Sequence, residues 1–114
     1  MLSQRHRLTK DGEIKRVMSK GKSFFSPYFR LKYLSNLLNL NRFAVVVSTK
    51  VSKKAVIRNQ LKRQLREEIR LNIEKIKPGF DFVISLSPQS KNIDHKQLRL
   101  EFLANLSKIK LLQK

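Results

Sequence analysis

Cysteine is absent from this 114-residue chain, which excludes disulfide frameworks, thiolate zinc sites and cysteine nucleophiles. Long apolar runs are missing too, and the densest, residues 43–47, is far too short to cross a bilayer. No apolar segment follows the basic N-terminus, so we expect no signal peptide. Acidic residues are also scarce: 8 Asp and Glu oppose 26 Lys and Arg, a formal net charge of +18. Such a surface attracts polyanions.

The apolar content of 40% is enough to bury one small core. We therefore expect a single domain over residues 1–114, with a basic arm at about 1–10 and a short flexible tail at about 110–114. The apolar residues are spread over several core-like elements instead of one cationic amphipathic helix, which disfavours a membrane partner. The composition predicts a cytoplasmic protein with a nucleic-acid partner.

Three segments have the apolar pattern of β-strands, at residues 29–34, 43–48 and 80–86. In the first, Arg30 and Lys32 share one face, opposite Phe29, Leu31 and Tyr33. The second is β-branched and continuous, which favours a more central strand. We also weigh a weak extra strand around residues 22–26.

Three other segments have the apolar period of helices, at residues 11–18, at 53–76 and after Asp94. Gly21 is a natural stop for the first, and Ser52 is a plausible N-cap for the second. Asp94 with Gln97 resembles a capping box. The last helix is expected to bury Leu98, Phe102, Leu106 and Ile109. The chain therefore reads as α+β, a single sandwich of order α-β-β-(β)-α-β-α.

The second helix carries the strongest functional signal, because residues 50–70 hold eight of the 26 basic residues. Cations recur every fourth position, at Lys54, Arg58, Lys62, Arg66 and Arg70. Apolar residues recur every fourth position as well, at Ile57, Leu61, Leu65, Ile69 and Ile73. Adjacent residues lie about 100° apart around a helix, so the two stripes run side by side. One stripe is expected in the core and the other at the surface.

A run of charge on a helix is most often a solvated face, in which acids alternate with bases. Here only Glu67 and Glu68 interrupt the cations, near the end of the stripe. Neighbouring like charges such as Arg58, Lys62 and Arg66 cost each other roughly a few tenths of a kcal/mol per pair. Phosphates offset that repulsion, and Arg adds planar donors for bidentate contact. The stripe therefore predicts RNA or DNA binding.

Residues 53–67 resemble the signature helix of the bacterial ribonuclease P protein subunit, which carries Arg-Asn-Arg, a Lys-Arg pair and a further Arg. The chain matches that pattern at Arg58, Asn59, Lys62, Arg63 and Arg66, and departs from it at Gln60, where the family usually has its second Arg. The resemblance extends over roughly residues 5–107 in the order and spacing of the elements.

The resemblance implies a fold like the second domain of ribosomal protein S5, with a left-handed βαβ crossover. It also implies the protein subunit of an endoribonuclease holoenzyme, which removes the 5′ leader from precursor tRNA. The subunit would bind the catalytic RNA 1:1, broaden its substrate range and lower its Mg²⁺ requirement, while the RNA holds most of the Mg²⁺ and performs hydrolysis. The residues expected on the RNA are Lys53, Lys54, Arg58, Asn59, Gln60, Lys62, Arg63 and Arg66.

The resemblance further implies a cleft for the leader between the first helix and the sheet. The family's usual cleft aromatics fall on Ile14 and Met18 and near Lys32, none of which is aromatic; a shift of one residue gives Tyr33 instead. Arg30 and Lys32 are the candidates for gripping phosphate. Core packing is an equally good interpretation of Ile14 and Met18. Packing is also favoured over RNA stacking for Phe24, Phe25 and Tyr28.

Side chains suited to catalysis are not grouped in the sequence. His6 and His95 are far apart, and the acids form no Asp-x-Asp or Glu-x-x-His pattern for a metal, so we assign no catalytic or metal residue. The alternative function is a ribosomal or other structural RNA-binding protein. A DNA-binding regulator is disfavoured because a strand, and not a helix, precedes the basic helix.

Overall fold

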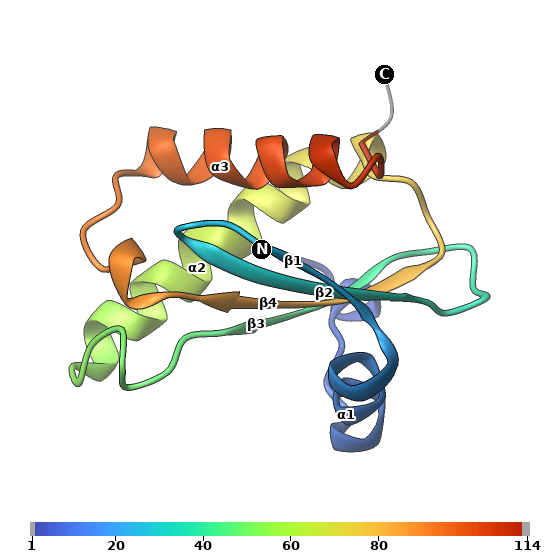
Figure 1. Cartoon of the computed structure of the whole chain (residues 1–114), viewed down its shortest axis with the longest axis horizontal. Helices are drawn as coiled ribbons and strands as arrows, with labels where there is room; N and C mark the ends of the chain where they lie inside the picture. Colours follow the sequence, from blue (N-terminus) through green and yellow to red (C-terminus); the bar gives the residue numbers. More distant parts are fainter. Residues whose placement is uncertain (1, 113–114) are drawn as a thin grey trace.

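A four-stranded sheet separates α1 from α2 and α3 in the computed structural model, which describes residues 2–112 (Figure 1). The helices are α1 (Asp11–Lys20), α2 (Ala55–Asn72) and α3 (His95–Lys108). The strands are β1 (Lys22–Phe25), β2 (Phe29–Ser35), β3 (Arg42–Val46) and β4 (Phe80–Leu86). Short 3-10 helices cover Gln4–His6, Ile73–Lys75 and Pro88–Ser90. The expected α+β sandwich, including the weak extra strand, is confirmed.

The sheet has the order β1-β2-β4-β3, so β4 is central and β3 lies at an edge. β4 pairs antiparallel with β2 and parallel with β3, and α2 makes the crossover between the parallel strands. The left-handed sense of that crossover stays a prediction. The expectation that segment 43–48 is a more central strand is wrong. Its continuous apolar pattern arises because both of its faces are buried from Phe43 to Val45. In addition, Leu8 N donates to Phe43 O at 2.8 Å, which covers part of the edge.

The beginning of α2 also differs from the prediction. The helix starts at Ala55, Lys54 occupies the N-cap position, and no side chain caps the helix. Ser52 is two residues too early to be the N-cap, and its Oγ accepts a hydrogen bond from Lys54 N at 3.1 Å. At α3 the prediction is confirmed, because Asp94 Oδ1 accepts from Gln97 N at 2.7 Å.

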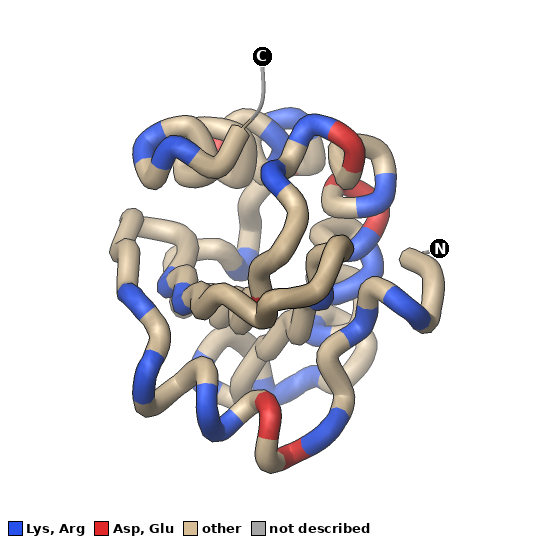
Figure 2. The backbone as a smooth tube through the Cα atoms, turned by 90° about the vertical axis from the view of Figure 1, so that its right-hand side faces the viewer, with Lys and Arg blue, Asp and Glu red and all other residues tan. Residues whose placement is uncertain are grey.

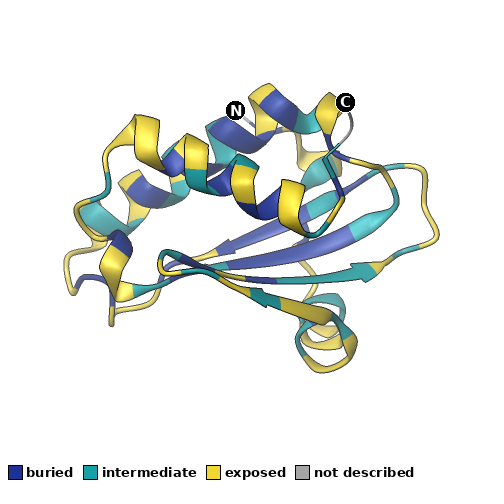
Figure 3. Ribbon diagram, turned by 45° about the horizontal axis from the view of Figure 1, so that its top comes forward, coloured by how far each residue is buried: buried dark blue, intermediate teal, exposed yellow. Residues whose placement is uncertain are grey.

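Apolar side chains form two clusters, one on each side of the sheet. Figure 3 marks the buried positions along the strands and on α2 and α3. The larger cluster lies under α2 and α3 and includes Leu65, Ile69 and Phe82, each 0% exposed. The expected apolar stripe of α2 is therefore confirmed as core. The smaller cluster lies under α1 and is formed by Leu8, Val17, Ala44 and Val83.

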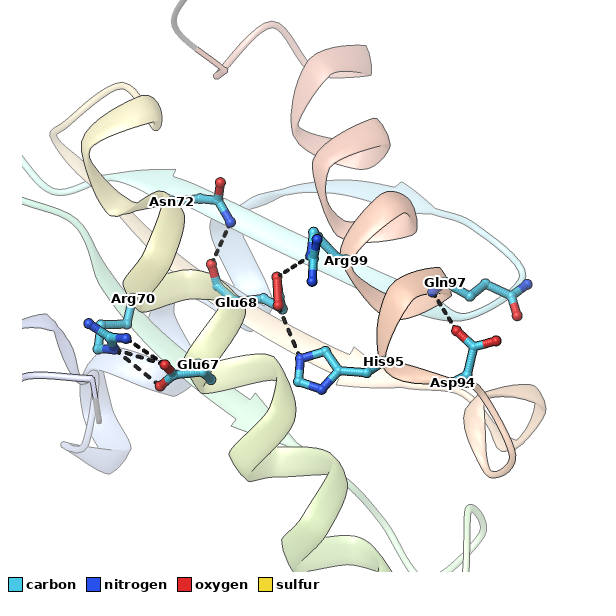
Figure 4. Close-up of polar contacts among 8 residues, drawn as sticks. All are labelled: Glu67, Glu68, Arg70, Asn72, Asp94, His95, Gln97 and Arg99. Atoms are coloured by element: carbon cyan, nitrogen blue, oxygen red, sulfur yellow. Dashed lines mark hydrogen bonds and ion pairs between the residues drawn. The ribbon is translucent and has the colours of Figure 1, made fainter.

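Two ion-pair groups fasten the helices in place. Arg42 donates to both carboxylate oxygens of Asp81 at 2.8 Å and pairs with Glu13 of α1 at 3.0 Å. The Asp81 hydrogen bonds raise the pKa of Arg42 above its ordinary value, so this link between α1 and the sheet stays charged. Between α2 and α3, the buried Glu68 carboxylate accepts from Arg99 at 3.0 Å and from His95 at 3.2 Å (Figure 4).

The C-terminal segment packs against the part of the chain that leads into β4. Leu111 is 6% exposed, and its carbonyl accepts a hydrogen bond from Lys77 N at 2.8 Å. Leu112 forms a bridge with Ile76. The flexible tail from about residue 110 stays a prediction, and residues 113–114 lie outside the described residues. Within the described chain, we find no helix with the length and apolar character that a membrane crossing requires.

Leu65→Ala is expected to lower the free energy of unfolding by about 2–5 kcal/mol, because it opens a cavity in the larger cluster. The measurement is urea unfolding followed by circular dichroism. Leu71→Ala is the matched control, since Leu71 lies on the same helix but is 56% exposed. Equal unfolding midpoints for the two variants would contradict the assignment of the stripes.

Candidate nucleic-acid interface

The exposed face of α2 lines a groove shared with the N-terminal segment. The groove has a volume of about 490 Å³, and its lining residues are Leu2, Arg7, Asn59, Lys62, Arg63, Arg66 and Glu67. Arg7 reaches this position because the preceding segment is held along β3, where Arg7 bridges Phe43. The structure thus brings together four predicted RNA-contacting residues and adds Arg7, which the helix pattern alone does not reveal.

Most cations of this groove are available for a partner. Among the described residues, Lys62, Arg63 and Arg66 form no ion pair with an acid. Figure 2 shows lysines and arginines spread over the fold, with acids at few positions. Glu67 pairs with Arg70, and this hydrogen-bonded contact lowers the pKa of Glu67. Arg70 is therefore engaged in an ion pair within α2, unlike the three cations of the groove.

Arg58 has a structural contact as well as a place in the basic stripe. Its Nη1 donates to the carbonyls of Ser52 and Lys53, both at 3.0 Å. The half-buried guanidinium thus holds the turn that leads into α2. Gln60, the position that departs from the family pattern, is exposed but does not line the groove.

The N-terminus of α2 is unusually positive. Lys53 and Lys54 are exposed, and they line a second hollow of about 520 Å³ together with Lys50 and Lys91. The first turn contains no acid. A helix N-terminus already carries a partial positive charge, so these lysines raise the free energy of the isolated protein and favour a bound anion. Both α2 hollows therefore have the charge that a bound phosphate group requires.

The structure divides the predicted leader-cleft residues. Ile14 and Met18 pack against the smaller apolar cluster under α1, as their core interpretation predicts. Lys32 Nζ donates to the Met18 carbonyl at 2.6 Å, so it fastens the end of α1 to β2. Tyr33 lies on the other face of the sheet, where its ring centroid is 6.2 Å from that of Phe80. The structure therefore does not bring Tyr33 together with the other candidates.

Arg30 is the one predicted cleft residue in an open position on this face, and the expectation that its neighbour Phe25 is packed is wrong. The Arg30 Cζ atom lies 4.9 Å from the ring centroid of Phe25, which is 61% exposed. Phe24, the residue before, packs partly buried against the larger cluster. Alternation along β1 places Phe24 and Phe25 on opposite faces of the sheet, which could have indicated that Phe25 is exposed. A strand of four residues is too short for this alternation to be a reliable pattern.

Clusters of metal-ligating side chains are absent from the described part of the chain. No three His, Asp or Glu side chains there lie close enough together to bind a metal ion. The lysines and arginines that line the two α2 hollows make the candidate site a cationic surface suited to contacting phosphate.

Comparison with known proteins identifies the family. The model of the ribonuclease P family matches residues 2–110. The ribonuclease P protein component of Natranaerobius thermophilus is 36% identical over 99% of this chain and 97% of its own length. That of Clostridioides difficile is 40% identical over 80% of each chain.

Solved structures agree with these sequence relatives. The ribonuclease P protein of Thermotoga maritima aligns with a TM-score of 0.84 and 30% identity, covering 91% of this chain and 97% of its own. The Staphylococcus aureus protein aligns with a TM-score of 0.87 over 95% of this chain and 98% of its own; at 24% identity it supports the fold alone. These matches, together with the basic face of α2, show that the chain belongs to the ribonuclease P protein family.

Proposed function

We propose that this chain is the protein subunit of ribonuclease P and binds the catalytic RNA, 1:1, through the basic face of α2. The observation that carries this proposal is the groove between α2 and the N-terminal segment. Its cations Arg7, Lys62, Arg63 and Arg66 form no ion pair with a described acid, while the opposite face of the same helix is core. The relatives bear the name ribonuclease P protein component, which supports a role within a larger enzyme.

In this proposal the RNA performs the hydrolysis of precursor tRNA and holds most of the Mg²⁺. The residues of the α2 face do not fit a Mg²⁺ site, because Mg²⁺ takes oxygen ligands and this face presents mainly ammonium and guanidinium groups. Glu67, the acid that lines the groove, is paired with Arg70. The protein instead neutralises phosphates, which lowers the amount of Mg²⁺ that the folded RNA requires.

We assign the 5′ leader of the precursor to the sheet face on which α1 packs, in the part around Arg30 that α1 leaves uncovered. Arg30 supplies an exposed cation there, and Lys32 adds a positive charge near the end of α1. Cytoplasmic location stays a prediction from the composition.

Reconstitution with ribonuclease P RNA tests this function. At low Mg²⁺ the chain is expected to raise precursor-tRNA cleavage strongly, whereas at high Mg²⁺ the RNA alone should approach the same rate, because added Mg²⁺ replaces the protein's charge. The measurement is the single-turnover cleavage rate across a Mg²⁺ series. Cleavage that is independent of the protein at every Mg²⁺ concentration would contradict the proposal. Recovery of ribosomal RNA, and not ribonuclease P RNA, with the purified protein would favour a structural RNA-binding role.

A further inference from the structure

We propose that Phe25 and Arg30 form a platform on which one unpaired RNA base stacks. The two residues are direct partners across the β1–β2 pairing, so their side chains leave the same face of the sheet. The Arg30 guanidinium lies over the Phe25 ring at 4.9 Å. The aromatic ring and the guanidinium group are both flat, and nucleic-acid bases stack on either one.

The exposure of Phe25 is not a by-product of core packing. Phe24 already supplies the aromatic ring that β1 contributes to the larger cluster, whereas Phe25 is 61% exposed on the other side. Val46 of β3 is 42% exposed, and its pairing with Ser85 places it on the same face. An apolar surface in this position costs free energy in water, and a stacked base would cover it.

The covering of this sheet face by α1 is incomplete. α1 packs over the half that contains Ala44 and Val83, and its end is fixed by the Lys32 contact with Met18. Gly21 closes the helix so near to β2 that a Cβ atom there would lie 2.9 Å from the Tyr33 carbonyl oxygen. The half around Phe25 and Arg30 therefore remains open beside the helix.

The groups around the platform favour RNA over a protein or lipid partner. A groove of about 320 Å³ adjoins the platform, and its polar lining consists of Arg30, Lys50, Ser26, Ser48, Ser85 and Ser87. It therefore offers two cations and four hydroxyl groups, and no acid lines it. Lys50 also lines the hollow at the N-terminus of α2. A single strand can consequently pass from the platform to the basic helix without leaving positive surface.

This inference rests on the proposed function, since the stacked base would belong to the precursor's leader. The test compares Phe25→Leu with Phe25→Trp in the reconstituted holoenzyme. Phe25→Leu keeps an apolar side chain and removes the flat ring, whereas Phe25→Trp keeps a ring. Binding is measured for a precursor tRNA with a long leader and for the same tRNA with a one-nucleotide leader.

Phe25→Leu is expected to weaken binding of the long-leader precursor by about five- to 150-fold, the range of one lost base stack. Binding of the one-nucleotide precursor should not change, and Phe25→Trp should restore the wild-type preference. A 2-aminopurine placed at successive leader positions should show quenching at one position, which Phe25→Leu removes. Leu100→Ala is the matched control, because Leu100 is 58% exposed on α3, in the layer on the other side of the sheet. Thermal melting verifies that every variant is folded.

Two outcomes overturn the inference in distinguishable ways. If the wild-type holoenzyme prefers the long leader and Phe25→Leu keeps that preference in full, the platform is wrong and the proposed function stands. If the wild type itself binds both precursors equally, the leader contact of the proposed function is wrong, and the platform is wrong with it.

Discussion

Replacing Lys62 and Arg66 together with alanine is expected to weaken binding to ribonuclease P RNA about a hundredfold at moderate salt. Each side chain lines the groove and has no described acid as a partner, so each can give a charge-assisted hydrogen bond to phosphate. One such bond contributes about 1.5–3 kcal/mol, and a tenfold change in affinity corresponds to about 1.4 kcal/mol. The loss of two contacts therefore multiplies to about a hundredfold or more.

The salt dependence of binding provides the more specific measurement. The slope of log K against log salt should flatten by roughly 1.4–1.8 units, because each phosphate contact contributes about 0.7 in single strands and about 0.9 in duplexes. The control is Lys96→Ala with Lys108→Ala on α3, which removes the same charge from exposed positions that do not line the groove. Equal losses in the two double variants would show that binding depends on total charge and not on the groove.

Arg58 is omitted from this test for a structural reason. Its contacts with the carbonyls of Ser52 and Lys53 mean that an alanine there would loosen the start of α2 as well as remove a cation. Weaker RNA binding by an Arg58 variant would therefore not separate an RNA contact from a structural effect. Lys62 and Arg66 have no such hydrogen bond to the described backbone.

Removing both partners of Glu68, by Arg99→Met and His95→Ala, is expected to lower the free energy of unfolding by about 3–5 kcal/mol. The Glu68 side chain is 1% exposed, and the two partners satisfy one carboxylate oxygen each. Without them a charged group stays buried and uncompensated, which costs far more than the ion pairs contribute. Methionine retains the apolar stem of Arg99, so the lost contact is mainly electrostatic.

A third substitution, Glu68→Leu, separates this cause from lost packing. With the buried charge gone, the triple variant should recover most of the lost stability, because an apolar side chain of similar size suits the interior between α2 and α3. Urea unfolding of the RNA-free protein measures all three states. The exposed pair Glu67→Gln with Arg70→Met serves as control and should leave stability nearly unchanged. A triple variant as unstable as the double variant would contradict the electrostatic explanation.

The candidate site was predictable in part from the sequence, and α2 shows why. Its apolar and basic residues both recur every fourth position, and this spacing alone places Leu65 in the core and Lys62 on the surface. Helix periodicity is a local property, so it survives whatever the helix packs against. The contacts that engage Arg70 and Arg58 are local as well, because their partners lie within six residues along the chain. The position of Arg7 in the groove is not local, because the N-terminal segment reaches α2 only through its contact with β3.

The sheet was less predictable, since strand order and register depend on contacts between distant segments. A continuous apolar segment indicates burial of both faces, but β3 reaches that state at an edge, covered by the N-terminal segment. Tyr33 illustrates the same limit: alternation correctly places it opposite Lys32, while its contact with Phe80 is decided by the pairing of β2 with β4.

The amino-acid sequence by itself determined the charge, the elements and the two faces of α2, because these follow from residue type and local period. Only the tertiary structure decided what the sheet leaves open. α1 covers half of one face, and the register of β1 with β2 sets Phe25 beside Arg30 in the other half. The exposure of a side chain depends on which elements pack over it. The strand period of two residues and the helix period of 3.6 residues do not contain this information.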